Sequence, residues 1–561
     1  MRQFNTLTSF LLSKSSNPTI NDTVTFQGYD AVGDGGNASW QFKGLTGQTP
    51  SQSPAQLGDA LLNDGNGNQW ELVATGRLNL SVIGVLDGLA DNYLSIVAGV
   101  AFAKRVKIGF IDLPRGVINT SAEILITSEG TTLSGQGAGS MGDGITGYKT
   151  RLVGTSATKS VIRLAIEDCR VENLLIDASG DRLTAAMDST ATEFNCGIRV
   201  EGVDVAAPEG DVFSTKLNHV HVINQPNDGI VIVGRCYKTS VTNFNCESNK
   251  GHGLVVTNGE HTSRTNTTIA GIIDLTSGKC LKNEGHGFKI GANNSTDYTF
   301  RVTVKNCEGL RNCGTPALLI DAADSFIHCD GLIGLNFTAT GKDKGGTPNG
   351  NAGITLMGLG GNLIDSRILS VTEPFRILKH PSRDSKGWVI NNPHIRDSTA
   401  AYYVYLDMGV ENIDIWIGDE TGGIATATNI LGITGLRYYY KGESFIKDKL
   451  EVRGGIYDDT GISLSNIKRN NAIVNATPLV ILDASTTGKM WKVSLRHTGD
   501  PCLSSCTFEV VGGSAPVVSN ISNQSGASVT FTPSVNGTDI ELATSAGIRN
   551  SDIFIKELAT A

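Results

Sequence analysis

Acidic residues and histidines recur between positions 228 and 286, in a stretch rich in Asn-x-Gly turns. His252 and His286 lie in matching hexapeptides, Asn-Lys-Gly-His-Gly-Leu and Asn-Glu-Gly-His-Gly-Phe, which begin at Asn249 and Asn283, 34 positions apart (283 − 249). Two carboxyl groups that flank a glycosidic bond, one of them able to hold a proton, can hydrolyse that bond by acid-base catalysis. The candidate catalytic residues are Asp228, Glu247, His252, Asp274, Glu284 and His286.

A second chemistry stays open for the same stretch. Eliminative cleavage needs a base and a cation beside an acidic sugar, and histidine, arginine and lysine side chains can supply both. Sugar binding also uses aromatic rings. The candidate substrate-binding residues are Tyr237, Lys238, Arg264, Tyr298 and Arg301. No calcium-ligand cluster stands out, and the glycines between Gly135 and Gly142 precede helix-breaking residues where a dinucleotide site needs a helix. We therefore expect no metal and no cofactor.

The repeated hexapeptide predicts the element that positions these residues. Cys246 and Cys280 each stand three positions before the repeated Asn, and weaker echoes of the turn begin at Asn227 and Asn312. A recurring strand-rich, glycine-punctuated unit without a helical period is typical of a solenoid built from strands. The stretch therefore predicts a parallel β-helix, in which equivalent positions on stacked coils lie ~4.8 Å apart.

A Val-x-Asn pattern supports the same architecture. It occurs at Val171, Val222, Val241, Val304, Val389 and Val410. In each copy we expect the valine to point inward and the asparagine to be buried at a corner, where it can bond turn amides and the Asn of the next coil.

The regions on either side of the coils differ in character. Residues 1–76 contain short strands and glycine turns and read as a small separate unit. The segment Asp87–Arg105 predicts an amphipathic helix, capped by Asp87 or Asp91, with Leu89, Tyr93, Val97 and Val100 on one face. Such a helix can cover the first open coil. We expect the β-helix over 77–437, a neck or linker over 438–470, and an antiparallel β-sandwich over 471–561 with a hairpin at Asn536-Gly537.

Composition excludes several classes of function. The net charge is −9, from 46 basic and 55 acidic residues, and there is no basic run, which argues against nucleic-acid binding. No stretch approaches the ~18 apolar residues of a membrane span. The N-terminus lacks a signal-peptide pattern. Eight of the ten cysteines lie between Cys169 and Cys329, inside the repeats, and we expect reduced core thiols in a protein made in the cytoplasm.

The layout as a whole carries a resemblance. The Gly33-Asp-Gly-Gly36 turn with Trp40 behind it, the helix, the strand that ends in Leu113-Pro-Arg-Gly116, the glycine turn after Leu133 and the coils behind it resemble a bacteriophage tailspike of the pectate-lyase-like β-helix superfamily. The resemblance implies a right-handed β-helix, a homotrimer, binding and cleavage of a bacterial surface polysaccharide, attachment to the virion tail through residues 1–76, and trimerisation or glycan binding by the C-terminal domain.

A local resemblance bears on the catalytic residues. Asn227-Asp228-Gly-Ile followed by Gly251-His252-Gly-Leu is similar to the Asp-Asp and Gly-His-Gly segments of polygalacturonases, which share the β-helix. The resemblance implies that Asp228 is an acid or base and that His252 is its neighbour one coil on. The alternative is a turn motif that simply repeats, with outward His stacked on His.

Three functions remain in competition at this point. The leading hypothesis is a trimeric tailspike that depolymerises capsular polysaccharide or O-antigen, by hydrolysis rather than elimination. The second is a non-enzymatic receptor-binding spike of the same shape. The third is a secreted pectin-type enzyme, against which the N-terminal unit and the absent signal peptide argue. We expect a bacterial polysaccharide and a phage tail protein as partners, and neither nucleic acid nor membrane insertion.

Overall fold

The fold is taken from a computed structural model of the 561-residue chain. The structure describes residues 2–13, 17–46, 49–138, 149–180, 182, 195–202, 212–234, 236–257, 272–291, 302–310, 312, 318–322, 327–330, 335–336, 352–358, 360–364, 367–369, 373–379, 384–391, 394–396, 404–406, 410–417, 436–440, 443–447, 467–473, 479–483, 490–497, 505–512, 514–524, 531–537, 539–544 and 549–558. The chain divides into two compact units, Met1–Gly442 and Glu443–Ala561. The finer boundaries expected at 76, 437 and 470 stay a prediction.

The first unit begins with a five-stranded sheet in the order β1-β2-β3-β5-β4. Its elements are β1 (Arg2–Phe4), α1 (Leu7–Leu11), β2 (Thr23–Phe26), β3 (Ala38–Leu45), α2 (Pro54–Leu57), β4 (Leu61–Asn63) and β5 (Asn68–Val73). Phe10, Phe26, Trp40 and Trp70 are buried and form edge-on and tilted ring contacts. Aromatic pairs of this kind add to the stabilisation from burial alone.

Helix α3 (Tyr93–Val106) links this sheet to the coils, after the short 3-10 helix η1 (Leu80–Ile83). The helix begins at Tyr93 rather than at the expected Asp87. Asp87 accepts a hydrogen bond from the backbone N–H of Val117 at 2.7 Å, which ties this segment to strand β8. Asp91 accepts from the backbone N–H of Ser121 at 3.0 Å and, as one of the two predicted capping residues, from that of Tyr93, the first residue of the helix, at 2.9 Å. The predicted apolar face is wrong, because Leu89 precedes the helix and is 41% exposed, Tyr93 and Val97 are only half-buried, and Val100 alone of the four is buried. The buried side chains of helix α3 include Ile96, Ala98, Val100, Phe102 and Ala103.

Ion pairs also join the helix to the first sheet. The Nε atom of Arg105 lies 2.9 Å from Oδ2 of Asp59, and the same guanidinium pairs with Glu71. Lys43 contacts the other carboxylate oxygen of Glu71 at 2.8 Å. Arg105, in the last turn of α3, therefore contacts the first sheet at Glu71 of β5 and the loop before β4 at Asp59.

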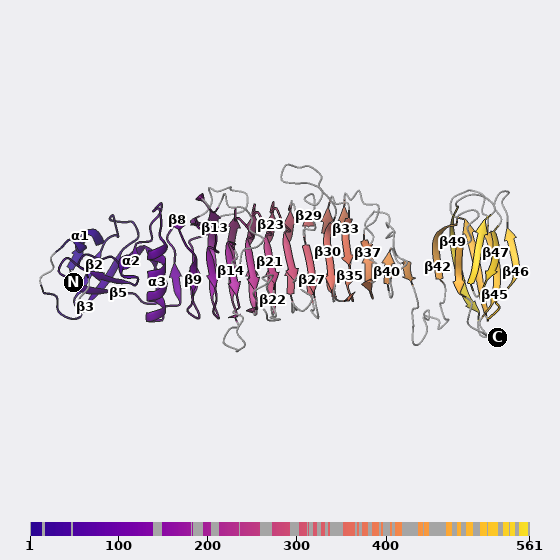
Figure 1. Ribbon diagram of the computed structural model, residues 1–561, viewed down its shortest axis with the longest axis horizontal. Coiled ribbons are helices and arrows are strands. Elements are labelled where there is room, and N and C mark those ends of the chain that lie inside the picture. Colours follow the sequence, from indigo (N-terminus) through magenta and orange to yellow (C-terminus); the bar gives the residue numbers. More distant parts are fainter. Residues whose placement is uncertain are drawn as a thin grey trace. The chain divides into compact units, whose positions relative to one another are not determined.

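Beyond the helix, the chain winds into a parallel β-helix, and the predicted architecture is confirmed (Figure 1). We name its stacked strands rows A, B and C. Row A contains β6 (Arg77–Asn79), β7 (Phe110–Asp112), β10 (Thr132–Ser134), β19 (Thr239–Thr242), β22 (Ile273–Thr276), β25 (Val302–Lys305), β28 (Ile327–Asp330), β31 (Gly361–Ile364), β35 (Val389–Asn391), β39 (Asp414–Ile417) and β40 (Leu436–Tyr440). Row B contains β8 (Gly116–Thr120), β11 (Thr150–Gly154), β20 (Asn245–Glu247), β23 (Lys279–Leu281) and β26 (Glu308–Leu310). The long strands β13 (Arg170–Ala178) and β16 (Lys216–Ile223) run through both rows.

Row C forms a ten-stranded parallel sheet of its own. Its strands are β9 (Ile124–Ile126), β12 (Ile162–Leu164), β14 (Ile198–Glu201), β17 (Ile230–Val233), β21 (Leu254–Thr257), β24 (Phe288–Gly291), β27 (Leu318–Ala322), β30 (Ala352–Gly358), β33 (Glu373–Leu378) and β37 (Val404–Leu406). Smaller parallel sheets adjoin the rows: β15 (Val212–Phe213) with β18 (Cys236–Tyr237), β34 (Ser385–Lys386) with β38 (Val410–Glu411), and β29 (Leu335–Asn336) with β32 (Arg367–Leu369) and β36 (His394–Arg396).

Left-handed residues make the corner between rows A and B. The register places Asn173, His219, Asn243, Ser277 and Asn306 in one column, and all five have φ between 51° and 58°. Val171, Val222, Val241 and Val304 are buried as expected. The Val-x-Asn asparagines are not buried, which corrects the expectation. Asn243 and Asn306 are exposed because a left-handed corner residue turns the chain with its backbone, and its side chain points outward.

The buried asparagine ladder lies instead in the turn between rows B and C. Asn249, Asn283 and Asn312 are fully buried. Oδ1 of Asn283 accepts from the backbone N–H and the Nδ2 of Asn249 at 3.1 and 2.8 Å, and Asn312 does the same for Asn283. Gln225, not Asn227, stands at the matching place one coil earlier and donates from its backbone to Asn249 at 3.0 Å. Each such bond contributes roughly 1 kcal/mol, and leaving a partner unpaired costs more.

Stacked apolar side chains fill the interior. Leu174, Val220 and Phe244 follow one another at one level, and Phe288 meets the ring of Phe244 edge-on at 6.1 Å between centroids. Cys169, Cys196, Cys236, Cys246, Cys280 and Cys307 are free and buried, as the repeat positions predicted. Trp388 is fully buried and donates from Nε1 to the carbonyl of Gly358 at 3.1 Å, so its ring is part of the core.

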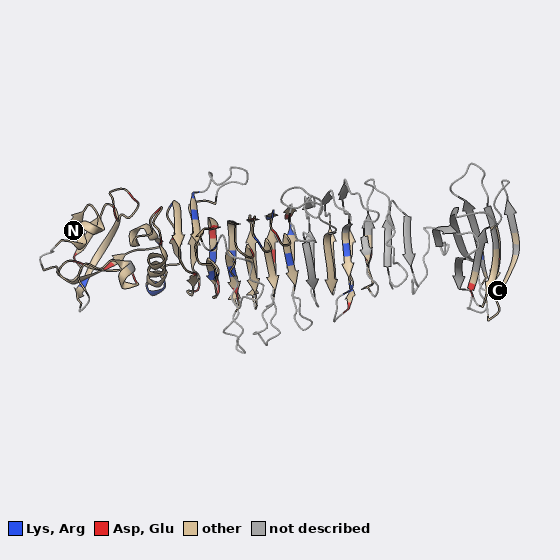
Figure 2. Ribbon diagram, turned by 45° about the horizontal axis from the view of Figure 1, so that its top comes forward, with Lys and Arg blue, Asp and Glu red and all other residues tan. Residues whose placement is uncertain are grey.

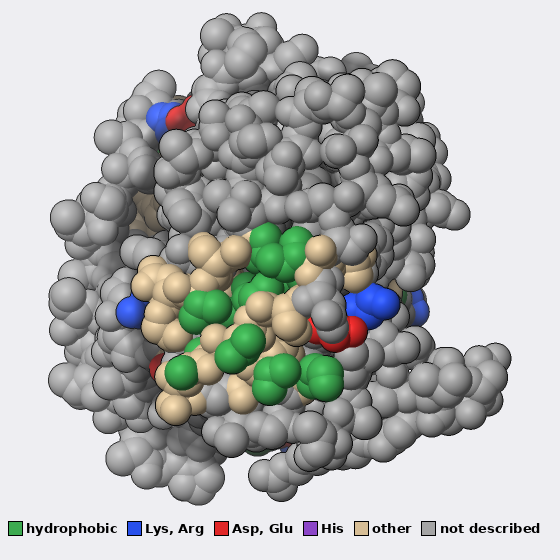
Figure 3. Space-filling model, turned by 90° about the vertical axis from the view of Figure 1, so that its right-hand side faces the viewer, with side chains coloured by type: hydrophobic (Ala, Val, Ile, Leu, Met, Phe, Trp, Pro, Cys, Tyr) green, Lys and Arg blue, Asp and Glu red, His purple; other side chains and the backbone are tan. Residues whose placement is uncertain are grey.

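The second unit consists of two antiparallel sheets after β41 (Glu443–Lys447). One contains β42 (Ile467–Ile473), β49 (Arg549–Leu558), β44 (Met490–His497), β45 (Ser505–Val511) and β46 (Val517–Gln524). The other contains β43 (Leu479–Asp483), β48 (Asp539–Thr544) and β47 (Phe531–Asn536). The predicted hairpin at Asn536 connects β47 to β48 through Gly537, whose φ is 63°. Exposed apolar side chains include Val511, Val517, Ile521 and Val535, and hydrophobic side chains gather on the face shown in Figure 3.

In the part of the chain that the structure describes, no helix has the length and apolar character needed to cross a membrane.

Candidate active site

The turn that enters row C stacks three of the predicted catalytic residues. The register aligns Ile230, Leu254 and Phe288, so the residues two positions earlier, Asp228, His252 and His286, form one column along the β-helix. The sequence repeat predicted the two histidines as equivalents. Asp228 lies in the same column because it also stands two residues before its row C strand, although its coil is shorter than the coil between the two histidines.

Hydrogen bonds connect each member of the column to the next. Oδ1 of Asp228 accepts from the backbone N–H of His252 at 2.6 Å, and Nδ1 of His252 accepts from the backbone N–H of His286 at 2.8 Å. The two imidazole rings are stacked, with centroids 4.9 Å apart and planes 7° apart. A ring nitrogen that accepts a hydrogen bond carries no proton. His252 is therefore a neutral imidazole with its proton on Nε2.

Glycine makes this close approach possible. A Cβ at Gly251 would lie 2.3 Å from Oδ1 of Asp228, and a Cβ at Gly285 would lie 2.5 Å from Nδ1 of His252. Any side chain at these two positions would force the acceptors away from the N–H groups they bind. The glycine before each histidine is thus required by the contact made with the preceding coil.

Asp228 lies near a buried thiol as well as near His252. The carboxyl residue is 7% exposed. Cys196 occupies the matching position one coil earlier, where Ile198 pairs with Ile230. Burial raises the pKa of Cys196 to about 12, and the charges of Arg199, Asp228 and Arg182 also act on it. A thiol with so high a pKa is protonated at neutral pH, so Cys196 contributes packing rather than nucleophilic chemistry.

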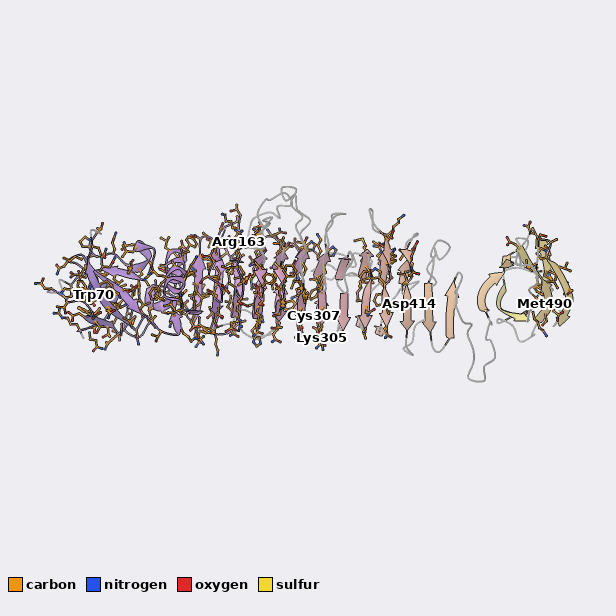
Figure 4. The ribbon with its side chains drawn as sticks, turned by 90° about the horizontal axis from the view of Figure 1, so that it is seen from below. Trp70, Arg163, Lys305, Cys307, Asp414 and Met490 are labelled. Atoms are coloured by element: carbon orange, nitrogen blue, oxygen red, sulfur yellow. The ribbon has the colours of Figure 1, made fainter. Side chains whose placement is uncertain are left out.

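A second group of charged residues covers the outer face of the first row C strands. Nε of Arg163 lies 2.7 Å from Oε2 of Glu201, and Arg199 pairs with the other oxygen of that carboxylate. Glu201 and Arg199 are 1% and 5% exposed. Glu123 accepts a hydrogen bond from Ser160 and lies 3.7 Å from Arg163. Figure 2 shows charged residues among these early coils, and Figure 4 shows Arg163 on the opposite side of the β-helix from Lys305.

A buried guanidinium holds the turns beside this group. Arg182 is 1% exposed and donates to Oε1 of Gln225 and to the backbone carbonyls of Ser156, Asn195 and Cys196 at 2.6–3.0 Å. Desolvation lowers its pKa to about 10, which leaves it charged at neutral pH. Its hydrogen bonds to several carbonyls tie three adjacent turns together.

The other predicted acidic residues lie on different rows or are more exposed. Glu247 ends a row B strand, with its Oε1 3.5 Å from Nζ of Lys282. Asp274 is exposed on row A, opposite Ser240 and Thr303. Glu284 is exposed on the same turn as His286, and its backbone N–H donates to the carbonyl of Asn249. The structure therefore brings Asp228, His252, His286 and Glu284 to one turn and leaves Asp274 on another face.

The predicted substrate-binding residues are only partly described. Tyr237 is half-buried and stacks on Phe213, with ring centroids 5.1 Å apart and planes 17° apart. Lys238 follows at a left-handed corner with φ of 55°. Arg264, Tyr298 and Arg301 lie outside the described residues.

The pairing of Arg163, Arg199 and Glu201 was missed at the level of sequence. The signal was present in Ile198-Arg-Val-Glu201, where charged residues alternate with apolar ones at outward positions of a strand. Among the residues that the structure describes, no group of three or more His, Cys, Asp or Glu side chains is arranged to hold a metal ion.

Comparison with known proteins assigns the fold. No family model and no curated protein matches the chain. Among solved structures, a tailspike protein of the Acinetobacter baumannii bacteriophage Fri1, a capsular polysaccharide depolymerase, is similar with a TM-score of 0.54 and 13% identity, covering 100% of this chain and 98% of that chain. Full-length tailspike protein 2 of the Escherichia coli O157:H7 bacteriophage CAB120 is similar with a TM-score of 0.51 and 11% identity, covering 99% of this chain and 80% of that chain. The chain has the parallel β-helix fold of these tailspikes.

Proposed function

We propose that the protein is a bacteriophage tailspike that binds and depolymerises a bacterial surface polysaccharide, capsule or O-antigen, by hydrolysis. The observation that carries this proposal is the contact of Asp228 with His252 on the turn into row C, in a chain whose fold matches a capsular polysaccharide depolymerase over its full length. A carboxylate held by a backbone N–H, next to a neutral histidine, is suited to acid-base work on a bound sugar.

The second carboxyl group in this proposal is Glu284. It lies on the same turn two coils further along, and coils are spaced ~4.8 Å apart, so the two backbones are separated by roughly 10 Å along the helix axis. Inverting glycosidases hold their carboxyl groups ~6.5–9.5 Å apart and retaining ones ~5–5.5 Å apart. We propose the inverting route, because backbones two coils apart leave more room between the side chains than a retaining pair needs. In this mechanism one of the two carboxyl groups takes a proton from water as the water attacks the anomeric carbon, and the other, which enters protonated, gives its proton to the leaving oxygen.

The remaining assignments belong to the same proposal. Residues 1–76 attach the spike to the phage tail, the functional form is a homotrimer located in the virion, and the C-terminal domain serves trimerisation or glycan binding. The resemblance of the chain's layout to tailspikes supports these assignments.

The test is product analysis on a panel of purified capsules and O-antigens. We expect new reducing ends without the ultraviolet absorbance of an unsaturated uronic product. Asp228→Asn and Glu284→Gln should remove this activity, while Asp274→Asn, an exposed carboxyl on row A, should retain it. Reducing ends with that absorbance would identify a lyase instead. A glycan that the protein binds but never shortens would identify a receptor-binding spike.

A further inference from the structure

A hollow on the outer face of row A has features of a binding site that the proposed catalytic turn does not use. It has a volume of about 240 Å³ and lies across three neighbouring coils. Its polar lining consists of Arg170, Glu172, Lys216, Asn218, Ser240 and Thr242. Long side chains on two coils meet short ones on the third, which leaves room for a sugar ring.

The two cations of the hollow are direct neighbours. The register of β13 and β16 places Arg170 opposite Lys216, and both side chains are exposed on the same face. Like charges that face each other across paired strands are unfavourable unless an anion lies between them. Among the described residues, no ion pair involves either of these two cations.

Other coils arrange their charges in the opposite way. Lys279 on row B pairs with Glu308 of the next coil at 2.9 Å. Arg77, which stands in the same column of row A as Arg170, pairs with Asp112 at 2.6 Å. The Arg170–Lys216 pair thus departs from the charge pairing that these coils show, and its side chains are directed at a cavity of suitable size.

The rest of the lining suits the neutral part of a sugar. Oγ1 of Thr242 donates to Oδ1 of Asn218 at 2.9 Å, which fixes the amide, and Ser240 presents a further hydroxyl. Glu172 can accept from sugar hydroxyls, which donate hydrogen bonds to carboxylates. The Phe213–Tyr237 ring stack comes directly before the same two row A strands, β16 and β19. Polar groups beside aromatic rings are typical of sites that bind carbohydrate.

We infer that this hollow binds a sugar residue that carries a carboxylate, with Arg170 and Lys216 on the carboxylate and the amide and hydroxyl groups on the ring. The inference rests on the proposed function and deepens it, because it names an acidic polysaccharide, one that contains a uronic acid, as the ligand. The site lies on row A, whereas Asp228 precedes row C. It therefore binds the polysaccharide and takes no part in the cleavage.

The test is ligand-observed NMR on the full chain with three probes, a methyl glucuronoside, the matching methyl glucoside and inorganic phosphate. We expect binding of the glucuronoside alone, weakened about tenfold or more in Arg170→Gln and in Lys216→Gln, because each removes a hydrogen bond to a charged group. Lys305→Gln, an exposed lysine further along row A, is the matched control and should bind as the parent does. All three variants change exposed residues and should unfold at the parent's temperature.

Three other outcomes would overturn the inference, and a fourth would support it while rejecting the proposed function. Phosphate that binds as tightly as the glucuronoside would identify a general anion site, and unchanged binding in both variants would exclude the hollow. Cleavage of a neutral glycan without glucuronoside binding would reject this site and leave the proposed depolymerase intact. Glucuronoside binding in a protein that cleaves no glycan would reject the depolymerase and leave the site intact.

Discussion

The backbone N–H of His286 donates a hydrogen bond of 2.8 Å to Nδ1 of His252, one coil below it. The bond fixes the orientation of the His252 ring and places its only proton on Nε2. His286 carries the stacked ring but stands one coil further from Asp228. The two histidines therefore lie in matching sequence motifs, but only His252 is on the coil next to the candidate carboxylate of Asp228.

This difference separates a catalytic contribution from a structural one. His252→Ala keeps the backbone N–H that Asp228 accepts and removes only the imidazole next to Asp228 in the column, and under the proposed mechanism it should lower the turnover of polysaccharide cleavage by about 100-fold or more. His286→Ala removes an equivalent ring one coil away and should lower it much less. Turnover measured as reducing ends formed at saturating glycan checks this. Equal losses in the two variants would mean that the stack acts only in folding.

The asparagine ladder should be sensitive to a single truncation. Asn283→Ala removes its side-chain hydrogen bonds to Asn249 and Asn312 and leaves the buried backbone N–H of Asn249 without its acceptor, which we expect to lower the free energy of unfolding by about 1–3 kcal/mol. Urea unfolding measures the change. Asn306→Gly, which keeps the left-handed corner at an exposed asparagine, should leave the unfolding midpoint nearly unchanged.

The close contact at Gly285 predicts a cost for one added methyl group. In Gly285→Ala the new Cβ would meet Nδ1 of His252 at 2.5 Å and the carbonyl carbon of Gly251 at 2.8 Å. Overpacking of this kind costs about 1–3 kcal/mol. Lys282→Ala, a nearby partly exposed position, serves as the control. A Gly285→Ala protein that unfolds like the control would show that the turn can relax without loss.

Breaking the buried ion pair should destabilise more than breaking an exposed one. Glu201→Gln leaves Arg199 and Arg163 without their shared carboxylate, and the expected loss is about 3–5 kcal/mol. Asp384→Asn removes the 2.8 Å pair with Lys386 at the surface and should have no measurable effect. Thermal unfolding of both variants makes the comparison. Similar unfolding temperatures for the two proteins would contradict the burial argument.

Acid should weaken the fold partly through His221. Desolvation by burial lowers the pKa of this histidine, and the neighbouring His219 lowers it further. Below pH ~6.5, the ordinary value, the unfolded chain binds a proton that folded His221 does not accept until its lower pKa is reached. Stability is therefore fully present above pH ~6.5 and falls as the pH drops toward the folded pKa. His221→Gln should reduce the slope of unfolding temperature against pH in this window, and an unchanged slope would assign the acid sensitivity elsewhere.

The parts of the fold that were predictable depend on repeated local patterns. The hexapeptides at Asn249 and Asn283 repeat because each turn must accommodate a side chain from the preceding coil. The β-helix and the histidine stack could therefore be predicted from the sequence. The buried asparagine ladder was assigned to the wrong motif, because Val-x-Asn marks a left-handed corner, where the backbone conformation matters and side-chain burial does not. Gln225 was missed because it performs the ladder's role with a different side chain.

The site was less predictable than the fold. Arg163 and Glu201 are 38 positions apart (201 − 163), and their pairing follows from the lengths of the loops between row C strands, which no periodicity reveals. The hollow on row A likewise depends on the register that sets Arg170 opposite Lys216. Residue type identified the candidate groups, whereas coil length decided which of them meet.

The corner column of Asn173, His219, Asn243, Ser277 and Asn306 bears on how such proteins diverge. One backbone conformation is adopted there by residues with an amide, an imidazole and a hydroxyl side chain, so the corner requires a backbone geometry and no particular side chain. Each coil can therefore exchange most of its outward residues over evolutionary time while its winding is preserved. The same fold can therefore be built from very different sequences, and the tailspike of bacteriophage Fri1, which has this fold, shares only 13% of its residues with this chain.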